Sequence, residues 1–204
     1  MHPRSAPHRS SARRIAAVPG ASRRQTHMRV ALTPPAELRA RRALTAFLAL
    51  YGILCLAHPD RYGLLDSVDL AIHEMGHLVF GPFGEFVGFA GGTLMQLLTP
   101  AAFVVYFARR ADRHAATVAL WWVAQNLWNI SVYVRDARSQ DLPLVGGGEH
   151  DWAYLLGETG LLAHDQAIGR AVHALGVVVF VCAIALGWRQ AGEESRGERL
   201  ASSA

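Results

Sequence analysis

Four long apolar runs without charged residues restrict what this chain can fold into. They cover residues 43–57, 86–108, 115–134 and 171–188. A helix needs about 20 apolar residues to cross about 30 Å of hydrocarbon, and the shortest run can span if the Arg side chains before it snorkel. A buried soluble bundle is the alternative, but four such runs in 204 residues favour a membrane protein.

The predicted fold class is all-α. We expect a polytopic helical membrane protein with about four spanning helices, a short or re-entrant helix over residues 66–82, and a short helix over 152–162. Arg residues favour the cytoplasmic side of a membrane. If residues 66–82 only dip into the bilayer, the Arg-rich segments share one side and the acidic loop 135–165 faces the other. We therefore expect an integral protein of a bacterial cytoplasmic membrane with its N-terminus in the cytoplasm.

The ends of the chain differ in composition from its middle. Residues 1–42 contain ten of the 20 Arg and a single acid, whereas the rest contains ten Arg and fifteen acids. Residues 1–40 are predicted to be a disordered Arg-rich tail; a transit peptide and a true start at Met28 are alternatives. Residues 41–190 would form the helical membrane domain and 191–204 a polar tail. The lipid bilayer is the expected partner, and no nucleic acid is expected because no recognition fold or aromatic pattern accompanies the Arg residues.

One pentapeptide, His73-Glu74-Met75-Gly76-His77, carries metal chemistry. On a helix, two His at i and i+4 share a face and can bind one Zn²⁺, and the Glu beside the first can act as a general base. Asp69 lies four residues before His73, where it could orient that imidazole. Ionisable groups within a membrane are costly and usually functional.

A catalytic zinc site needs a third protein ligand. The richest candidate segment is Gly146-Gly147-Gly148-Glu149-His150-Asp151. His150 is the first choice for this ligand, followed by Asp151 and Asp136. Asp151 is equally suited to cap the helix over 152–162, and His150 could be an ordinary loop residue.

Polar side chains interrupt two of the apolar runs. Gln125, Asn129 and Asp136 are spaced by four and seven, which places them on one helix face. Gln96 is alone in its run. Such groups should turn inward, either to line a substrate site or hydrogen-bond the metal ligands, or to join helices.

With its His-Glu-Met-Gly-His sequence on an apolar helix, the chain resembles the site-2-type intramembrane zinc metalloproteases. The resemblance covers residues 66–82 and implies that His73 and His77 bind zinc and that Glu74 is the general base. The family's usual third ligand, an Asp in an Asn-Pro-Asp-Gly motif, has no counterpart here. Asp136 is the nearest match in position.

The leading functional hypothesis is a membrane-embedded zinc metallohydrolase that cleaves a membrane-associated protein or peptide with water activated by the metal. A non-enzymatic membrane protein that binds metal for structure, sensing or transport is the alternative. An accidental match of the pentapeptide would predict no stoichiometric metal.

Overall fold

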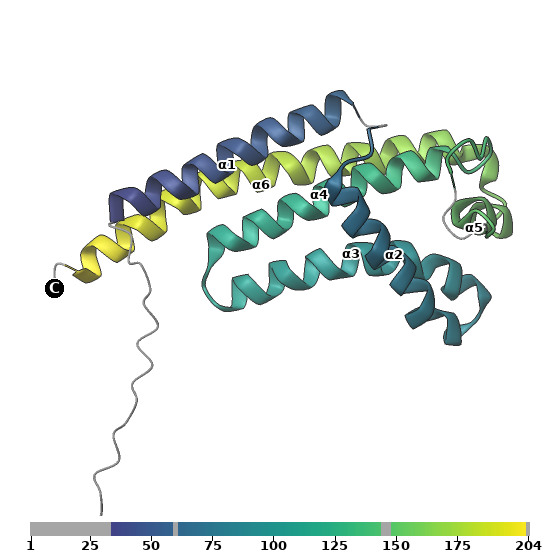
Figure 1. Cartoon of the computed structure of the whole chain (residues 1–204), viewed down its shortest axis with the longest axis horizontal. Helices are drawn as coiled ribbons and strands as arrows, with labels where there is room; N and C mark the ends of the chain where they lie inside the picture. The colour runs from purple at the N-terminus through teal and green to yellow at the C-terminus, as the bar shows by residue number, and fades with distance from the viewer. Residues whose placement is uncertain (1–33, 59–60, 144–147, 203–204) are drawn as a thin grey trace, which may run out of the picture. The chain divides into compact units, whose positions relative to one another are not determined.

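All regular structure in the described part of the chain is helical. The computed structural model describes residues 34–58, 61–143 and 148–202. Figure 1 shows their helices, which are α1 (Pro34–Ala57), α2 (Leu64–Phe80), α3 (Glu85–Arg109), α4 (Arg113–Arg135), α5 (Asp151–Glu158) and α6 (Asp165–Ser202), with the short 3-10 turns η1 (Gly81–Phe83) and η3 (Leu162–His164). The all-α class is confirmed for these residues.

Two helices extend into segments that the sequence predicts to be tails. α1 begins at Pro34, inside the predicted tail 1–40, and residues 1–33 lie outside the described residues. Proline suits the first turn of a helix because its φ is already helical, and Glu37 pairs with Arg41 one turn later at 2.9 Å. α6 continues to Ser202 through most of the predicted polar tail.

Three helices in the described residues are long and apolar enough to cross a membrane: Ala36–Ala57, Glu85–Arg109 and Leu162–Glu193. They contain three of the four predicted spans. The fourth, residues 115–134, forms most of α4, which is not among them. Four spans therefore remain a prediction, while three are compatible with an integral membrane protein.

α4 is the central helix because it contacts α6, α3 and α1. Its Trp121, Ala124 and Trp128 form a buried apolar cluster with Phe180 and Ala183 of α6. Small residues permit the close packing: a Cβ at Gly176 would overlap the Trp128 indole. This cluster fixes the helix that carries the predicted polar stripe.

α2 and α3 form a tight pair on another side of α4. Gly81-Pro82 ends α2, and Gly84 reverses the chain with φ of 111°, a left-handed conformation that glycine adopts without strain. Gly76 and Gly91 face each other so closely that a Cβ on either would overlap the other's backbone. Small residues allow helix backbones to approach in this way, and the approach brings α2 side chains against α3.

α5 returns the chain toward this pair, where it contacts α3 and α4. It begins at Asp151 and ends at Glu158, earlier than the predicted helix 152–162, because the chain turns at Gly160 with φ of 68°. Asp136, at the end of α4, accepts hydrogen bonds from the backbone N–H groups of Asp141 and Leu142. These bonds organise the start of the loop that leads to α5.

Candidate metal centre

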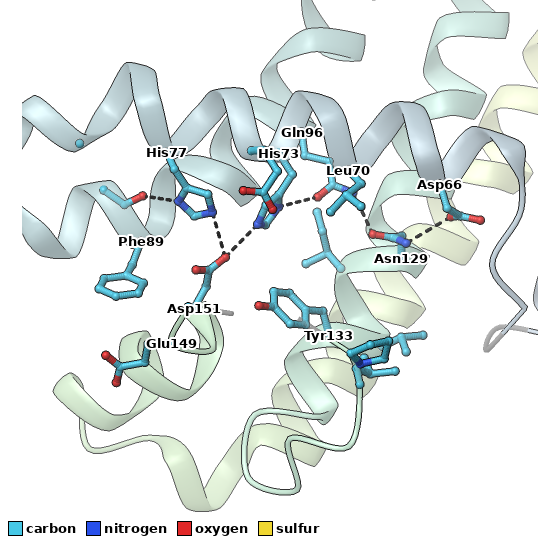
Figure 2. A pocket seen from close by; sticks show the side chains of 18 of the residues that line it. Asp66, Leu70, His73, His77, Phe89, Gln96, Asn129, Tyr133, Glu149 and Asp151 are labelled. Atoms are coloured by element: carbon cyan, nitrogen blue, oxygen red, sulfur yellow. Dashed lines mark hydrogen bonds and ion pairs between the residues drawn. The ribbon is translucent and has the colours of Figure 1, made fainter. Parts of the chain in front are cut away.

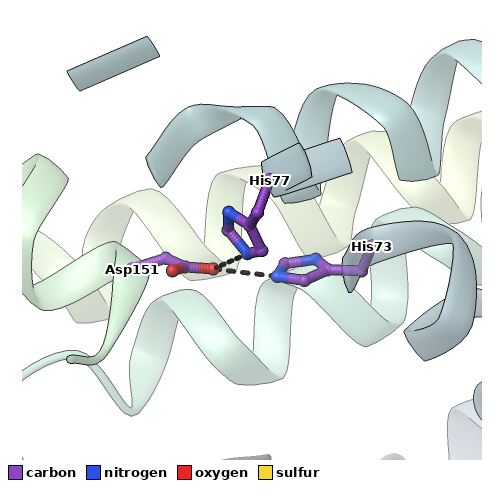
Figure 3. A group of neighbouring side chains, drawn as sticks. All are labelled: His73, His77 and Asp151. Carbon is purple, nitrogen blue, oxygen red and sulfur yellow. Dashed lines mark hydrogen bonds and ion pairs between the residues drawn. The ribbon is translucent and has the colours of Figure 1, made fainter. Parts of the chain in front are cut away.

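Three side chains from two distant segments converge on one point. His73 and His77 lie one turn apart on α2, and Asp151 is the first residue of α5. Figure 3 shows both imidazoles directed at the same carboxylate oxygen, Asp151 Oδ2, which lies 2.8 Å from His73 Nε2 and 3.3 Å from His77 Nε2. The three groups could hold a metal ion, since their ligand atoms all lie within 4.8 Å of one another.

The far nitrogen of each imidazole has a hydrogen-bond partner on α3. Nδ1 of His77 lies 2.8 Å from the Gly88 carbonyl oxygen, and Nδ1 of His73 lies 3.1 Å from Gln96 Oε1. Both partners are acceptors, so both Nδ1 atoms donate. Metal-binding histidines usually have this arrangement, which fixes the ring and directs the other nitrogen at the ion.

The glycines of α3 make room for these rings. A Cβ at Gly92 would overlap the imidazole of His73, and Gly88 supplies a backbone carbonyl within reach of His77. The α2–α3 contact at Gly76 and Gly91 sets this distance. The glycine-rich start of α3 therefore shapes the centre directly.

The electrostatics of the centre favour a charged carboxylate. Burial alone would raise the pKa of Asp151, but hydrogen bonds from His73 and His77 outweigh it and lower that pKa below its usual value. The same bond to Asp151 raises the pKa of His77 to about 9 against the opposing effect of burial. Without a metal, these shifts favour an ionised Asp151 beside a protonated His77.

Two of the three donor separations are close to those of a small tetrahedral ion. With metal–ligand bonds of about 2.0–2.1 Å, neighbouring donors in a tetrahedral zinc site lie about 3.3 Å apart. The contacts of 2.8 and 3.3 Å from the imidazoles to Asp151 are near this spacing. A shift of about half an ångström at the shorter contact would admit the ion.

A cavity of about 1050 Å³ opens beside the three ligands. Figure 2 shows Tyr133, Phe89 and Leu70 around it, and Glu74 also lines it. Glu74 and the three candidate ligands therefore border one solvent-accessible space. The arrangement offers three potential metal ligands, a neighbouring acid that could act as a base, and room for a further molecule.

His150 and Asp136, two of the predicted candidates for third ligand, are not part of this group. His150 is fully buried as the N-cap of α5, where its Nδ1 accepts from the backbone N–H of Ala153 at 3.2 Å. Its Nε2 faces Asp136 Oδ2 at 3.4 Å. The capping role expected for Asp151 thus falls to His150, and it is Asp151 that lies beside the two imidazoles, where His150 was expected first.

Some of the polar residues predicted to lie near the centre contact it, and others bond elsewhere. Asp69, predicted to orient His73, instead accepts hydrogen bonds from Trp122 and Asn126 of α4. Gln96 contacts His73 and donates to Asn129 at 2.9 Å, and both amides line the cavity. Gln125 donates to Asp66 at 2.9 Å, away from the imidazoles.

Sequence reasoning missed three contributors to the centre: Asp66, Gly92 and Tyr133. Asp66 has a readable signal, because an acid three residues after Gly63 suits a helix start, and it accepts from the Gly63 N–H at 2.7 Å. Tyr133 has none, since its place in the cavity depends on how α4 rotates against α2.

The chain was also compared with known proteins. No protein-family model, curated protein or solved structure matches it.

Proposed function

We propose that this protein is an integral membrane zinc metallohydrolase that cleaves a membrane-associated protein or peptide, in the manner of a metalloprotease. The observation that carries the proposal is the convergence of His73, His77 and Asp151 beside a cavity that Glu74 also lines. Three protein ligands and an open position are typical of catalytic zinc sites, whereas structural sites have four protein ligands.

Zinc is preferred because two imidazoles and one carboxylate form a common zinc ligand set. Manganese, iron and cobalt are the ions that the same donors also accept. A bound zinc ion would polarise a substrate carbonyl and bring the pKa of water at the site toward neutral.

The chain's own residues would then perform the proton transfers. Glu74 would accept the proton of the attacking water and deliver it to the leaving amine. Tyr133 lines the cavity with its hydroxyl beside the backbone N–H of Asp151. From there it would donate a hydrogen bond to the carbonyl oxygen as that atom gains negative charge.

Exposed apolar surface supports the membrane setting. α1 and α6 expose large side chains such as Phe47, Leu50, Val178 and Val181. The end of α2 and the turn after it do the same, with Leu78 80% and Phe83 72% exposed. α2 has 17 residues, fewer than the roughly 20 that a full span needs, which supports a helix that enters the bilayer and returns. The proposed orientation keeps the N-terminus in the cytoplasm.

The first experiment combines metal analysis with a hydrolysis assay on detergent-purified protein. Wild type, Glu74→Gln and His73→Ala are compared for zinc per chain and for cleavage of internally quenched peptides that contain one apolar segment of about 20 residues. We expect about one zinc in wild type and in Glu74→Gln, little in His73→Ala, and cleavage by wild type alone.

Two results would contradict the proposal. Cleavage by Glu74→Gln at the wild-type rate would remove Glu74 from the mechanism. Full zinc binding without cleavage of any peptide would favour the non-enzymatic metal-binding function.

A further inference from the structure

We infer that Asp66 determines which nitrogen of His73 carries a proton, through two intervening amides, and so keeps the metal-facing nitrogen free. Asp66 lies on α2 seven residues before His73, which places both on one face of the helix. The inference rests on the metal-binding part of the proposed function and does not depend on hydrolysis.

Four side chains form one continuous hydrogen-bonded path, which Figure 2 shows crossing from α2 to α4 and back through α3. Asn129 Nδ2 donates to Asp66 Oδ1 at 3.2 Å, and Gln96 Nε2 donates to Asn129 Oδ1 at 2.9 Å. Gln96 Oε1 then lies 3.1 Å from His73 Nδ1. Gln96 and His73 are both buried apart from the small part of each that borders the cavity.

The path has a single direction because an ionised carboxylate only accepts hydrogen bonds. Asp66 therefore requires the NH₂ group of Asn129, which leaves the Asn129 oxygen for the NH₂ group of Gln96. The Gln96 oxygen then faces His73, whose Nδ1 must donate. Each amide could be reversed alone, but reversal of either would set two donors or two acceptors against each other.

Asp66 is a firm anchor for the path. Its second oxygen accepts from the Gly63 N–H at 2.7 Å, and Gln125 donates to Oδ1 at 2.9 Å. The start of α2 and the polar face of α4 thus hold this carboxylate in place.

The direction of the path matters because Asp151 favours the other position of the His73 proton. Its Oδ2 lies 2.8 Å from His73 Nε2 and is best satisfied when that nitrogen carries the proton. A neutral histidine has one proton, and a proton on Nε2 would block the atom that faces the other two ligands. The path from Asp66 favours the proton on Nδ1 and leaves Nε2 available.

Zinc titration against a competing chelator, in detergent, tests the inference. Gln96→Met removes the acceptor at nearly constant volume and should weaken zinc binding 10- to 100-fold, the usual effect of losing an outer partner of a metal-bound histidine. Gln96→Glu keeps the acceptor that faces His73 but opposes the Asn129 oxygen, so it should restore binding only in part. Gln166→Met is the matched control, since it removes a glutamine that donates to the Arg135 carbonyl, outside the path.

Nitrogen-15 NMR of the metal-free protein supplies a second measurement, with the His73 ring assigned by its absence in His73→Ala. We expect protonated Nδ1 in wild type and in Gln166→Met, and protonated Nε2 with bare Nδ1 in Gln96→Met. Unchanged ring protonation in Gln96→Met, or a zinc affinity of Gln96→Met equal to that of Gln166→Met, would overturn the inference. Absence of zinc from the wild type would instead defeat the proposed function, while the NMR comparison would still decide the tautomer.

Discussion

The α2–α3 pair and the α4–α6 pair use the same packing device for different purposes. Between α2 and α3, Gly92 leaves space for the imidazole of His73, and Asn129 of α4 bonds to Gln96 and Asp66 beside it. Between α4 and α6, Gly176 leaves space for the indole of Trp128. The absence of a Cβ accommodates a candidate metal ligand in the first pair and closes an apolar core in the second.

The contacts that shape the candidate metal centre and the contacts that stabilise the fold therefore lie in different parts of the molecule. Directional hydrogen bonds join the elements on the α2–α3 side, so a substitution there should alter geometry at the cavity. Apolar burial, which has no direction, joins α4 to α6, so a substitution there should alter stability and leave the centre intact.

The largest effect is expected from Asp151→Ala. This change removes the only ligand that α5 contributes to the group, so zinc affinity should fall at least a hundredfold, measured by chelator competition. Glu149→Ala, an exposed neighbour that lines the same cavity, is the control and should retain zinc. Equal losses in both variants would mean that α5 disorder, and not a lost ligand, explains the result.

Tyr133→Phe should affect turnover and leave the metal in place. Loss of one donor to a developing oxyanion typically lowers kcat by about a hundredfold, and zinc content should be unchanged. Tyr154→Phe is the matched control. Tyr154 is not among the described residues that line the cavity, and its ring stacks on Phe89 with centroids 4.1 Å apart, a contact that does not need the hydroxyl group. A change in KM without a change in kcat would assign Tyr133 to substrate binding alone.

A pair of glycine variants compares the α2–α3 pair with the α4–α6 pair directly. Gly92→Ala forces a methyl group into the space of His73, and Gly176→Ala does the same to Trp128. Overpacking typically costs about 1–3 kcal/mol where the neighbours cannot move. The far end of the His73 ring borders the cavity and can turn aside, so Gly92→Ala should weaken zinc binding with little change in the metal-free Tm. The Trp128 indole is buried, so Gly176→Ala should lower Tm and keep zinc stoichiometry in the folded fraction. Similar behaviour of the two variants would show that the two helix pairs are not independent.

The parts that sequence could predict are those that local spacing determines. The helix around His73 and His77 follows from apolar flanks and an i, i+4 pair, and the polar face of α4 follows from its periodicity. The choice between His150 and Asp151 could not be read, because both residues suit both roles. The capping bond from the Ala153 N–H to His150 and the return of α5 toward α3 place Asp151, and not His150, beside the two imidazoles.

Contacts between helices were the least predictable. The sequence predicts Asp69 as the partner of His73 and Gln96 only as an inward-facing amide. In the structure Asp69 turns toward Trp122, while the Gly76–Gly91 contact brings Gln96 within reach of His73. The rotation of a helix and its distance from its neighbour depend on packing along the whole helix pair. Neither can be predicted from the residues around one position in the sequence.

The smallest effect is expected from a substitution in the apolar contact between α4 and α6. Phe180 packs edge to face on Trp128 with ring centroids 5.3 Å apart, and aromatic pairs of this kind contribute about 1 kcal/mol beyond their buried area. Phe180→Leu should therefore lower Tm by a few degrees and leave zinc affinity at the wild-type value, because no bond of the path from Asp66 to His73 involves α6. A drop in zinc affinity would show that α4 transmits strain from its apolar face to its polar face, and the two sides of the helix would have to be treated as one unit.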